Sequence, residues 1–298
     1  MPGLARFRAN AFWDRKGPGA VFRVIPSKVL TAEQLGLSNH LLQLCQLNKG
    51  LILVTGPTGS GKSTTLSAMI DYINRTRHDH IITIEDPIEF VHDNQKCLVN
   101  QREVHTHTDS FKHALRAALR EDPDIVLVGE LRDLETVAIA IETAETGHLV
   151  FGTLHTTTAA SAVDRLIDQF PADRQSQVRT MLSESLRAVI AQNLCRKIGG
   201  GRVAALEVLM CTGAVSNLIR EGKTFQIASM MQVGKNVGMV TLNDALMDLV
   251  SKKIVAPDEA YSKAVDKSGF EALLKRGGFS LETKPPTAAA APATAPAR

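Results

Sequence analysis

The stretch Gly56-Pro57-Thr58-Gly59-Ser60-Gly61-Lys62-Ser63 decides the fold of this chain. It matches the pattern G-x-x-x-x-G-K-[ST] completely, and it lies between an apolar segment, 51–55, and a segment suited to a helix, 62–75. In this context the pattern is typical of a loop that wraps phosphates, because its glycines let backbone N–H groups approach an anion closely. The sequence therefore predicts a nucleoside triphosphate site, with ATP and Mg²⁺ as the expected ligands, at the start of a helix.

Each residue type in this loop suits that chemistry. Lys62 is expected to bridge the β- and γ-phosphates, and Ser63 to bind Mg²⁺. Thr64, the next residue along the helix, is expected to support the α-phosphate. The backbone that cradles the phosphates belongs to Gly56, Pro57, Thr58, Gly59, Ser60 and Gly61. A glycine-rich turn with a solvated lysine would not explain why all these constraints coincide.

Short apolar segments alternate with longer amphipathic segments beyond this loop. The predicted strands are 51–55, 81–84, 125–128, 149–154 and 204–209. The predicted helices are 31–45, 62–75, 110–120, 133–146, 159–168 and 172–195. The strands are too apolar to have a face in water, which favours a mostly parallel sheet covered by helices on both faces. The predicted fold class is therefore α/β, with a P-loop NTPase core.

The two ends of the chain differ from this core. Residues 1–30 alternate apolar and basic positions around Gly17-Pro18-Gly19, which predicts a strand hairpin. Strand signals stop after Thr212, so residues 212–283 are expected to form a small helical subdomain. Residues 284–298 are mostly Ala, Pro and Thr and are expected to be a disordered tail. The ATPase core is therefore expected to span residues 31–211.

Composition limits the class of protein. Apolar residues make up 44% of the chain and charged residues 22%, as in a folded soluble protein. No apolar run approaches the roughly 20 residues of a membrane span, and no secretory signal opens the chain, so we expect a cytoplasmic protein. The 4 cysteines form no C-x-x-C pair, which argues against a zinc site or a disulfide framework. The α/β core and the basic start could also suit a nucleic-acid translocase, but we identify no interleaved aromatic-basic platform of the kind that binds nucleic acid, so no nucleic-acid partner is expected.

Polar residues follow three of the predicted strands. Glu130 stands where the acid of such folds approaches Mg²⁺ and the attacking water, although it could instead cap the helix that starts at 133. The cluster Glu85-Asp86-Pro87-Ile88-Glu89 offers a carboxylate that could position the water. His155 could sense the γ-phosphate by hydrogen bonding, and a purely structural histidine is the alternative.

These elements, worded GPTGSGKSTT, TIEDPIEF, DPDIVLVGE with LRD, and GHLVFGTLHTT, resemble the secretion ATPases that drive type II secretion and type IV pili. Over residues 4–275 the chain is most similar to the PilT-type pilus retraction ATPases. The resemblance implies a RecA-like core, with residues 1–30 as the remnant of a PAS-like N-terminal domain. It also implies an ATP-hydrolysing homo-hexamer, cytoplasmic and peripheral at the inner membrane. The implied partners are an inner-membrane pilus platform protein and related pilus ATPases.

The resemblance also implies roles for single residues. Glu89 would be the catalytic carboxylate, with Glu85 as the alternative, and Glu130 would belong to the Mg²⁺ site. Arginines that reach a neighbouring subunit's nucleotide would stabilise charge in the transition state. The arginines and histidines that match family positions are Arg120, Arg132, His148 and His155.

Three other functions compete with the retraction motor: a pilus assembly ATPase, a type II secretion ATPase and a ring subunit that binds ATP without hydrolysing it. Residues 214–221 are similar to the A-I-R-N-L-I-R-E element of retraction motors and depart from it at the second and third positions. Assembly motors of the family usually carry a tetracysteine zinc site, and this sequence has none. A pilus assembly ATPase or a type II secretion ATPase is therefore less favoured. The third is a ring subunit that binds ATP without hydrolysing it, against which the carboxylates of Glu89 and Glu130 argue.

Overall fold

The computed structural model describes residues 6–25 and 28–281, so the expected tail at 284–298 lies outside the described residues. The strands are β1 (Arg6–Asp14), β2 (Gly17–Ile25), β3 (Gly50–Thr55), β4 (His80–Glu85), β5 (Leu98–Glu103), β6 (Ile125–Val128), β7 (Leu149–Leu154), β8 (Leu186–Arg196) and β9 (Arg202–Met210). The helices are α1 (Asn39–Leu44), α2 (Lys62–Thr76), α3 (Phe111–Ala118), α4 (Leu134–Glu145), α5 (Ala159–Ile167), α6 (Ala172–Ser185), α7 (Gly213–Arg220), α8 (Ile227–Val233), α9 (Leu242–Ser251), α10 (Pro257–Lys263) and α11 (Lys267–Arg276). Two short 3-10 helices are η1 (Thr224–Gln226) and η2 (Lys235–Val237).

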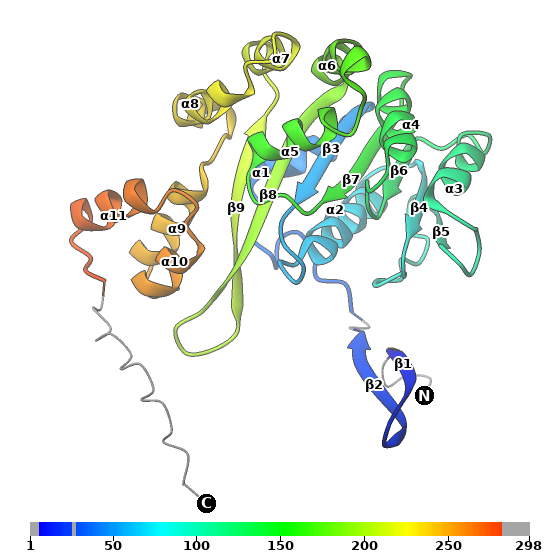
Figure 1. The fold of residues 1–298 in the computed structure, drawn as a ribbon, viewed down its shortest axis with the longest axis horizontal. Helices are drawn as coiled ribbons and strands as arrows, with labels where there is room; N and C mark the ends of the chain where they lie inside the picture. The colour runs from blue at the N-terminus through cyan, green and yellow to red at the C-terminus, as the bar shows by residue number, and fades with distance from the viewer. Residues whose placement is uncertain (1–5, 26–27, 282–298) are drawn as a thin grey trace, which may run out of the picture.

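A seven-stranded sheet in the order β5-β4-β6-β7-β3-β8-β9 forms the centre of the molecule (Figure 1). All neighbouring strands in it are parallel except β8 and β9, which are antiparallel. Because parallel strands end at the same edge of the sheet, the loops after β3, β4, β6 and β7 meet there. The predicted α/β fold with a mostly parallel sheet is confirmed.

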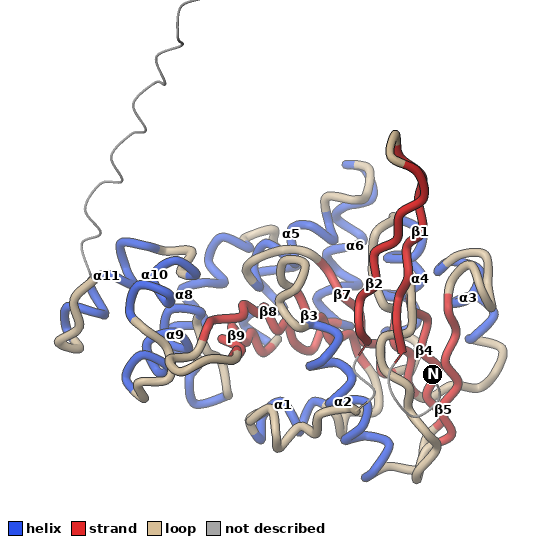
Figure 2. Tube along the Cα trace, turned by 90° about the horizontal axis from the view of Figure 1, so that it is seen from below, coloured by secondary structure: helices blue, strands red, loops and turns tan. Residues whose placement is uncertain are grey.

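Helices cover both faces of this sheet, as its side view shows (Figure 2). Leu51 and Leu53 of β3 belong to one apolar core, which includes residues of α3, α4, α5 and α6. Ile52 and Val54 point to the opposite face and pack with residues of α1 and α2. A strand buried on both faces has no polar face to show in its sequence, which explains the continuous apolar runs.

Two predicted elements were wrong in their extent, and one strand was missed. The helix expected at 172–195 ends at Ser185, and the chain continues as β8, which is buried on both faces and so has no alternating pattern. The helix expected at 31–45 is only α1, because Gly36 adopts a φ of 67° and interrupts it. The edge strand β5 was missed because its sequence, LVNQRE, is largely polar.

The predicted N-terminal hairpin is confirmed as β1 paired with β2, which lies apart from the main sheet (Figure 1). Its turn lies at Arg15 and Lys16, two residues before the predicted position, since Asp14 pairs with Gly17. Residues opposite each other in the register share a face. One face is entirely apolar and exposed, and we call it the apolar hairpin face: Phe7, Ala9, Ala11, Trp13, Pro18, Ala20, Phe22 and Val24.

Beyond β9 the described chain, up to residue 281, contains helices and no strand, as the sequence predicts. Helices α9, α10 and α11 form their own apolar core with Cys195 of β8 and Ala205 of β9. The C-terminal helices therefore pack on the far ends of the last two strands of the sheet. The division into domains stays a prediction.

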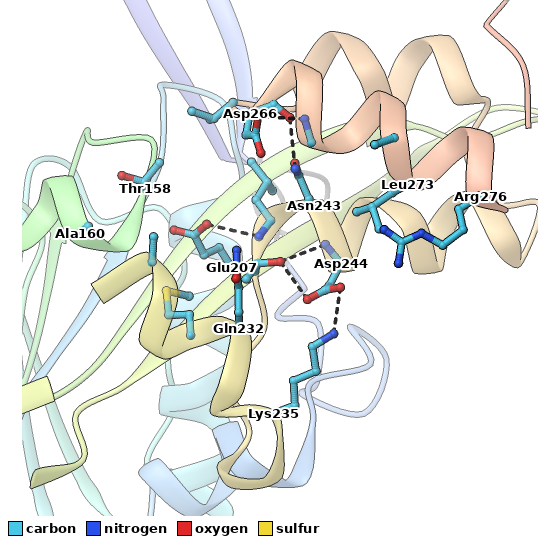
Figure 3. A pocket seen from close by; sticks show the side chains of 17 residues that line it. Thr158, Ala160, Glu207, Gln232, Lys235, Asn243, Asp244, Asp266, Leu273 and Arg276 are labelled. Carbon is cyan, nitrogen blue, oxygen red and sulfur yellow. Dashed lines mark hydrogen bonds and ion pairs between the residues drawn. The ribbon is translucent and has the colours of Figure 1, made fainter. Parts of the chain in front are cut away.

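A cavity of about 580 Å³ lies between the core and these C-terminal helices (Figure 3). The carboxylate of Glu207, on β9, accepts hydrogen bonds from the backbone N–H of Ala159 at 2.7 Å and of Leu242 at 3.2 Å. Burial raises the pKa of this carboxyl, and the two N–H donors lower it in part. Glu207 thus joins the first residue of α5 to the first residue of α9.

Candidate active site

The phosphate loop connects the end of β3 to the start of α2 at the carboxyl edge of the sheet. Gly59 and Gly61 have φ angles of 79° and 89°, in the left-handed region that favours glycine. A Cβ atom at Gly56 would overlap the carbonyl oxygen of Gln192. The glycines at these positions therefore follow from the shape of the loop and from its close contact with β8.

Lys62 lies over the mouth of the loop. Its Nζ donates to the carbonyl of Gly56 at 2.8 Å and lies 3.5 Å from Nδ1 of His155. Burial lowers the pKa of the ammonium, and the nearby charges of Glu130 and Glu89 raise it in part. The ammonium therefore stands between the loop and two carboxylates at the ends of neighbouring strands.

Glu130 follows β6 and binds two side chains at once. Its Oε1 accepts from Nε of Arg132 at 2.6 Å and from Nε2 of His155 at 3.0 Å. Burial raises the pKa of this carboxyl, but the hydrogen bond and charge of Arg132, with His155, lower it below its usual value. Glu130 does not cap the following helix, because Asp133 does so by accepting from the N–H of Thr136 at 2.9 Å. The ionised Glu130 carboxylate is thus held beside Lys62.

The acidic cluster after β4 contains two different carboxyl groups. The Oε1 of Glu85 accepts from the hydroxyl of Thr83 at 2.8 Å and from the side-chain amide of Gln101 at 3.1 Å. Burial raises the pKa of Glu85, although these hydrogen bonds lower it in part. Glu89 is exposed, and its charge acts on Lys62. The exposed Glu89 is therefore free to meet a ligand, whereas Glu85 is engaged with its own strand and the next.

Residues 4–200 match the family model described as Type II/IV secretion system protein. The chain belongs to this family. The "Type IV pilus retractation ATPase PilT" of Pseudomonas aeruginosa is 60% identical over 270 residues, which are 91% of this chain and 78% of the relative. The "Twitching motility protein" of Neisseria gonorrhoeae is 57% identical, over 89% of this chain and 71% of the relative.

A solved structure is similar to this secretion ATPase over most of its chain. The crystal structure of the pilus retraction motor PilT with bound ADP has a TM-score of 0.86 at 51% identity, covering 91% of this chain and 78% of the other. The predicted resemblance is confirmed, and the chain is a nucleotide-binding ATPase. In the described ranges, no helix is both long enough and apolar enough to pass through a bilayer.

The other residues that the sequence predicts for the site do not all lie near Lys62. Ser63 is exposed and Thr64 half-buried on the first turn of α2. Arg120 is exposed just after α3, and its guanidinium makes no hydrogen bond or ion pair with any described residue. His148 lies at the start of β7, at the opposite end from His155 and roughly 20 Å away at about 3.3 Å per residue. The structure therefore brings together Lys62, Glu130, Arg132 and His155, and it separates His148 from them.

One residue of the site was missed in the sequence. The side chain of Gln192, on β8, is hydrogen-bonded to Ser60 and Thr65. No motif marks this glutamine, and its segment was assigned to a helix. A correct assignment of 186–196 as a strand beside β3 would have been the signal, because it places Gln192 next to the loop.

Proposed function

We propose that this secretion ATPase is the motor that hydrolyses ATP to retract type IV pili. The observation that carries the proposal is the meeting of Lys62, Glu130 and His155 at the mouth of the phosphate loop. The names of the relatives indicate the filament on which the motor would act, because they describe pilus retraction and twitching motility. An ATP-consuming site and a filament to pull on are together what such a motor requires.

We propose the following roles for the side chains at this site. Lys62 leaves the Gly56 carbonyl to bridge the β- and γ-phosphates, which lie along the loop's N–H groups. The hydroxyl of Ser63 and the ionised carboxylate of Glu130 are the oxygen donors that Mg²⁺ prefers, so these two residues would hold it. The ion would neutralise charge on the phosphates. Glu89 would orient the attacking water and accept its proton.

His155 would report whether a γ-phosphate is present. When its proton lies on Nε2 and is donated to Glu130, Nδ1 can accept from the Lys62 ammonium, so the ring connects the two charges. A γ-phosphate near Lys62 competes for both contacts. The ring would therefore change partners when ATP binds and change back when phosphate leaves, which moves the segment that leads into α5.

The working assembly, we infer, is a homo-hexamer in the cytoplasm at the inner membrane. An isolated two-stranded sheet is marginally stable, so the apolar hairpin face is expected to pack against a neighbouring copy. Arg120 and Arg132 have exposed side chains suited to reach a neighbour's nucleotide. A pilus platform protein of the inner membrane and related pilus ATPases would be the other partners. The proposed domains are the N-terminal remnant at 1–30, the ATPase core at 31–211 and the helical subdomain at 212–283, followed by the tail at 284–298.

Sizing the purified chain with and without nucleotide tests the assembly. We expect a mass near six times the 32.2 kDa of one chain when nucleotide is present. Phe22→Asp, on the apolar hairpin face, should abolish that species because it places a charge in the contact. Arg23→Ser, on the opposite face of the same hairpin, is the matched control and should leave it intact. A hexamer that survives Phe22→Asp would mean that the hairpin does not form the contact.

Turnover and motility test the function itself. The purified chain should hydrolyse ATP, and it should restore twitching to a Pseudomonas aeruginosa strain that lacks its retraction ATPase. Nucleotide binding without turnover would instead indicate a non-hydrolysing ring subunit. Restored pilus assembly in a strain that lacks its extension motor would indicate the assembly alternative.

A further inference from the structure

A buried glutamine on β8, Gln192, forms a hydrogen bond with the backbone of the phosphate loop. Gln192 is 2% exposed and directly follows Ala191, the residue that pairs with Thr55 at the end of β3. Its Nε2 donates to the carbonyl of Ser60 at 2.7 Å, and its Oε1 accepts from the hydroxyl of Thr65 at 2.7 Å. One amide group therefore connects the loop to the first turns of the helix that carries Lys62.

The loop is also shaped to lie against this residue. A Cβ atom at Gly56 would overlap the backbone carbonyl of Gln192, and one at Gly61 would lie 2.8 Å from its Nε2. Residue 192 thus fills the space beside two of the loop's glycines. A side chain at Gly56 would require β8 to move away, and one at Gly61 would require the Gln192 amide to shift.

The hydrogen bond to Ser60 fixes the orientation of a peptide group. In a trans peptide the C=O and the following N–H point in opposite directions. Because Gln192 holds the Ser60 carbonyl toward β8, the N–H of Gly61 must point away from β8. That N–H is one of the backbone donors a β-phosphate would meet.

We propose that Gln192 is a positioning residue, which sets the Ser60–Gly61 peptide and thereby the affinity of the loop for the β-phosphate. The bond from Thr65 anchors the same amide to α2, so the loop and the helix keep one relative position. Gln192 acts through the loop and makes no contact with the reacting atoms. The inference rests on the nucleotide site proposed above and adds the residue that preorganises it.

The change that tests this role is Gln192→Leu, which keeps the volume and removes both hydrogen bonds. Binding of a fluorescent ADP analogue to the full chain should weaken about 10- to 100-fold, as expected when a buried carbonyl loses its donor. The turnover number at saturating ATP should change less than about threefold, because Gln192 does not stabilise the transition state selectively. The expected effect is therefore on KM and Kd.

A matched control separates this role from general stability. Asn74 is, like Gln192, a buried side-chain amide, and it lies on α2 at the end of the helix away from the phosphate loop. Its Nδ2 donates to the carbonyl of Asp93 at 2.8 Å, and its Oδ1 accepts from the backbone N–H of Gln95 at 3.1 Å. Asn74→Leu should lower the melting temperature and leave the affinity of the folded protein for nucleotide unchanged. Equal loss of affinity in both variants would overturn the proposal, as would wild-type affinity in Gln192→Leu.

A second variant decides the matter if Gln192→Leu does not fold. In Gln192→Glu the introduced carboxyl can donate to the Ser60 carbonyl only when it is protonated. The KM for ATP, divided by the wild-type value at the same pH, should therefore fall as the pH is lowered through the titration of that carboxyl. A ratio that does not change with pH would overturn the proposal. If the wild type itself bound no nucleotide, the proposed function would fail, and with it this inference.

Discussion

Replacing Lys62 with alanine is expected to weaken ATP binding by about 100-fold or more and to abolish measurable turnover. Each hydrogen bond from a charged donor contributes about 1.5–3 kcal/mol, and about 1.4 kcal/mol corresponds to a tenfold change in affinity. The ammonium lies 2.8 Å from the Gly56 carbonyl over the loop mouth, where it would meet both terminal phosphates. Calorimetry with ATP and a phosphate-release assay measure the two effects.

The control for this change is Lys49→Ala. Lys49 is an exposed lysine that precedes β3, at the end of the strand opposite to the phosphate loop. The Lys49→Ala variant should bind and hydrolyse ATP as the wild type does, because the substitution removes the same charge at a site far from the loop. Full activity in Lys62→Ala would show that the nucleotide site is assigned to the wrong residues.

The second large effect is expected from Glu89→Gln, which should bind ATP normally and lose turnover by about 100-fold or more, the usual contribution of a general base. Glu89 is exposed near Lys62, and its amide counterpart keeps the size of the side chain but cannot accept a proton. ATP affinity and single-turnover rates, measured on the same preparation, separate binding from chemistry.

Glu130→Gln is the matched variant, and it should act on the metal requirement. We expect the Mg²⁺ concentration for half-maximal turnover to rise about tenfold or more, since even residues outside the ligand shell change metal affinity by about 10- to 100-fold. If Glu130→Gln alone stopped hydrolysis with an unchanged Mg²⁺ requirement, the roles of Glu89 and Glu130 would have to be exchanged. Normal turnover in both variants would point to Glu85 as the base.

The strands that face the phosphate site were predictable because of where they lie. The segments 51–55, 125–128 and 149–154 are central in the sheet and buried on both faces, so their apolar runs match the observed strands closely. Strand β5 needs no apolar run, because it lies at the edge of the sheet and none of its residues is fully buried. Strand β8 is apolar, but it follows the last residue of α6 directly, with no glycine or proline between them, so the sequence carries no signal for the boundary.

The sequence alone determined the phosphate loop, its strand and helix, and the acids at two strand ends, since glycine positions and buried apolar runs are local properties of the chain. Only the tertiary structure decided which of these groups meet. It joined Glu130 to Arg132 and His155, moved His148 to the far edge of the sheet, and placed Gln192 beneath the loop. Such contacts depend on strand order and register, which pair residues more than 100 positions apart, such as Ser60 and Gln192, and no local pattern encodes them.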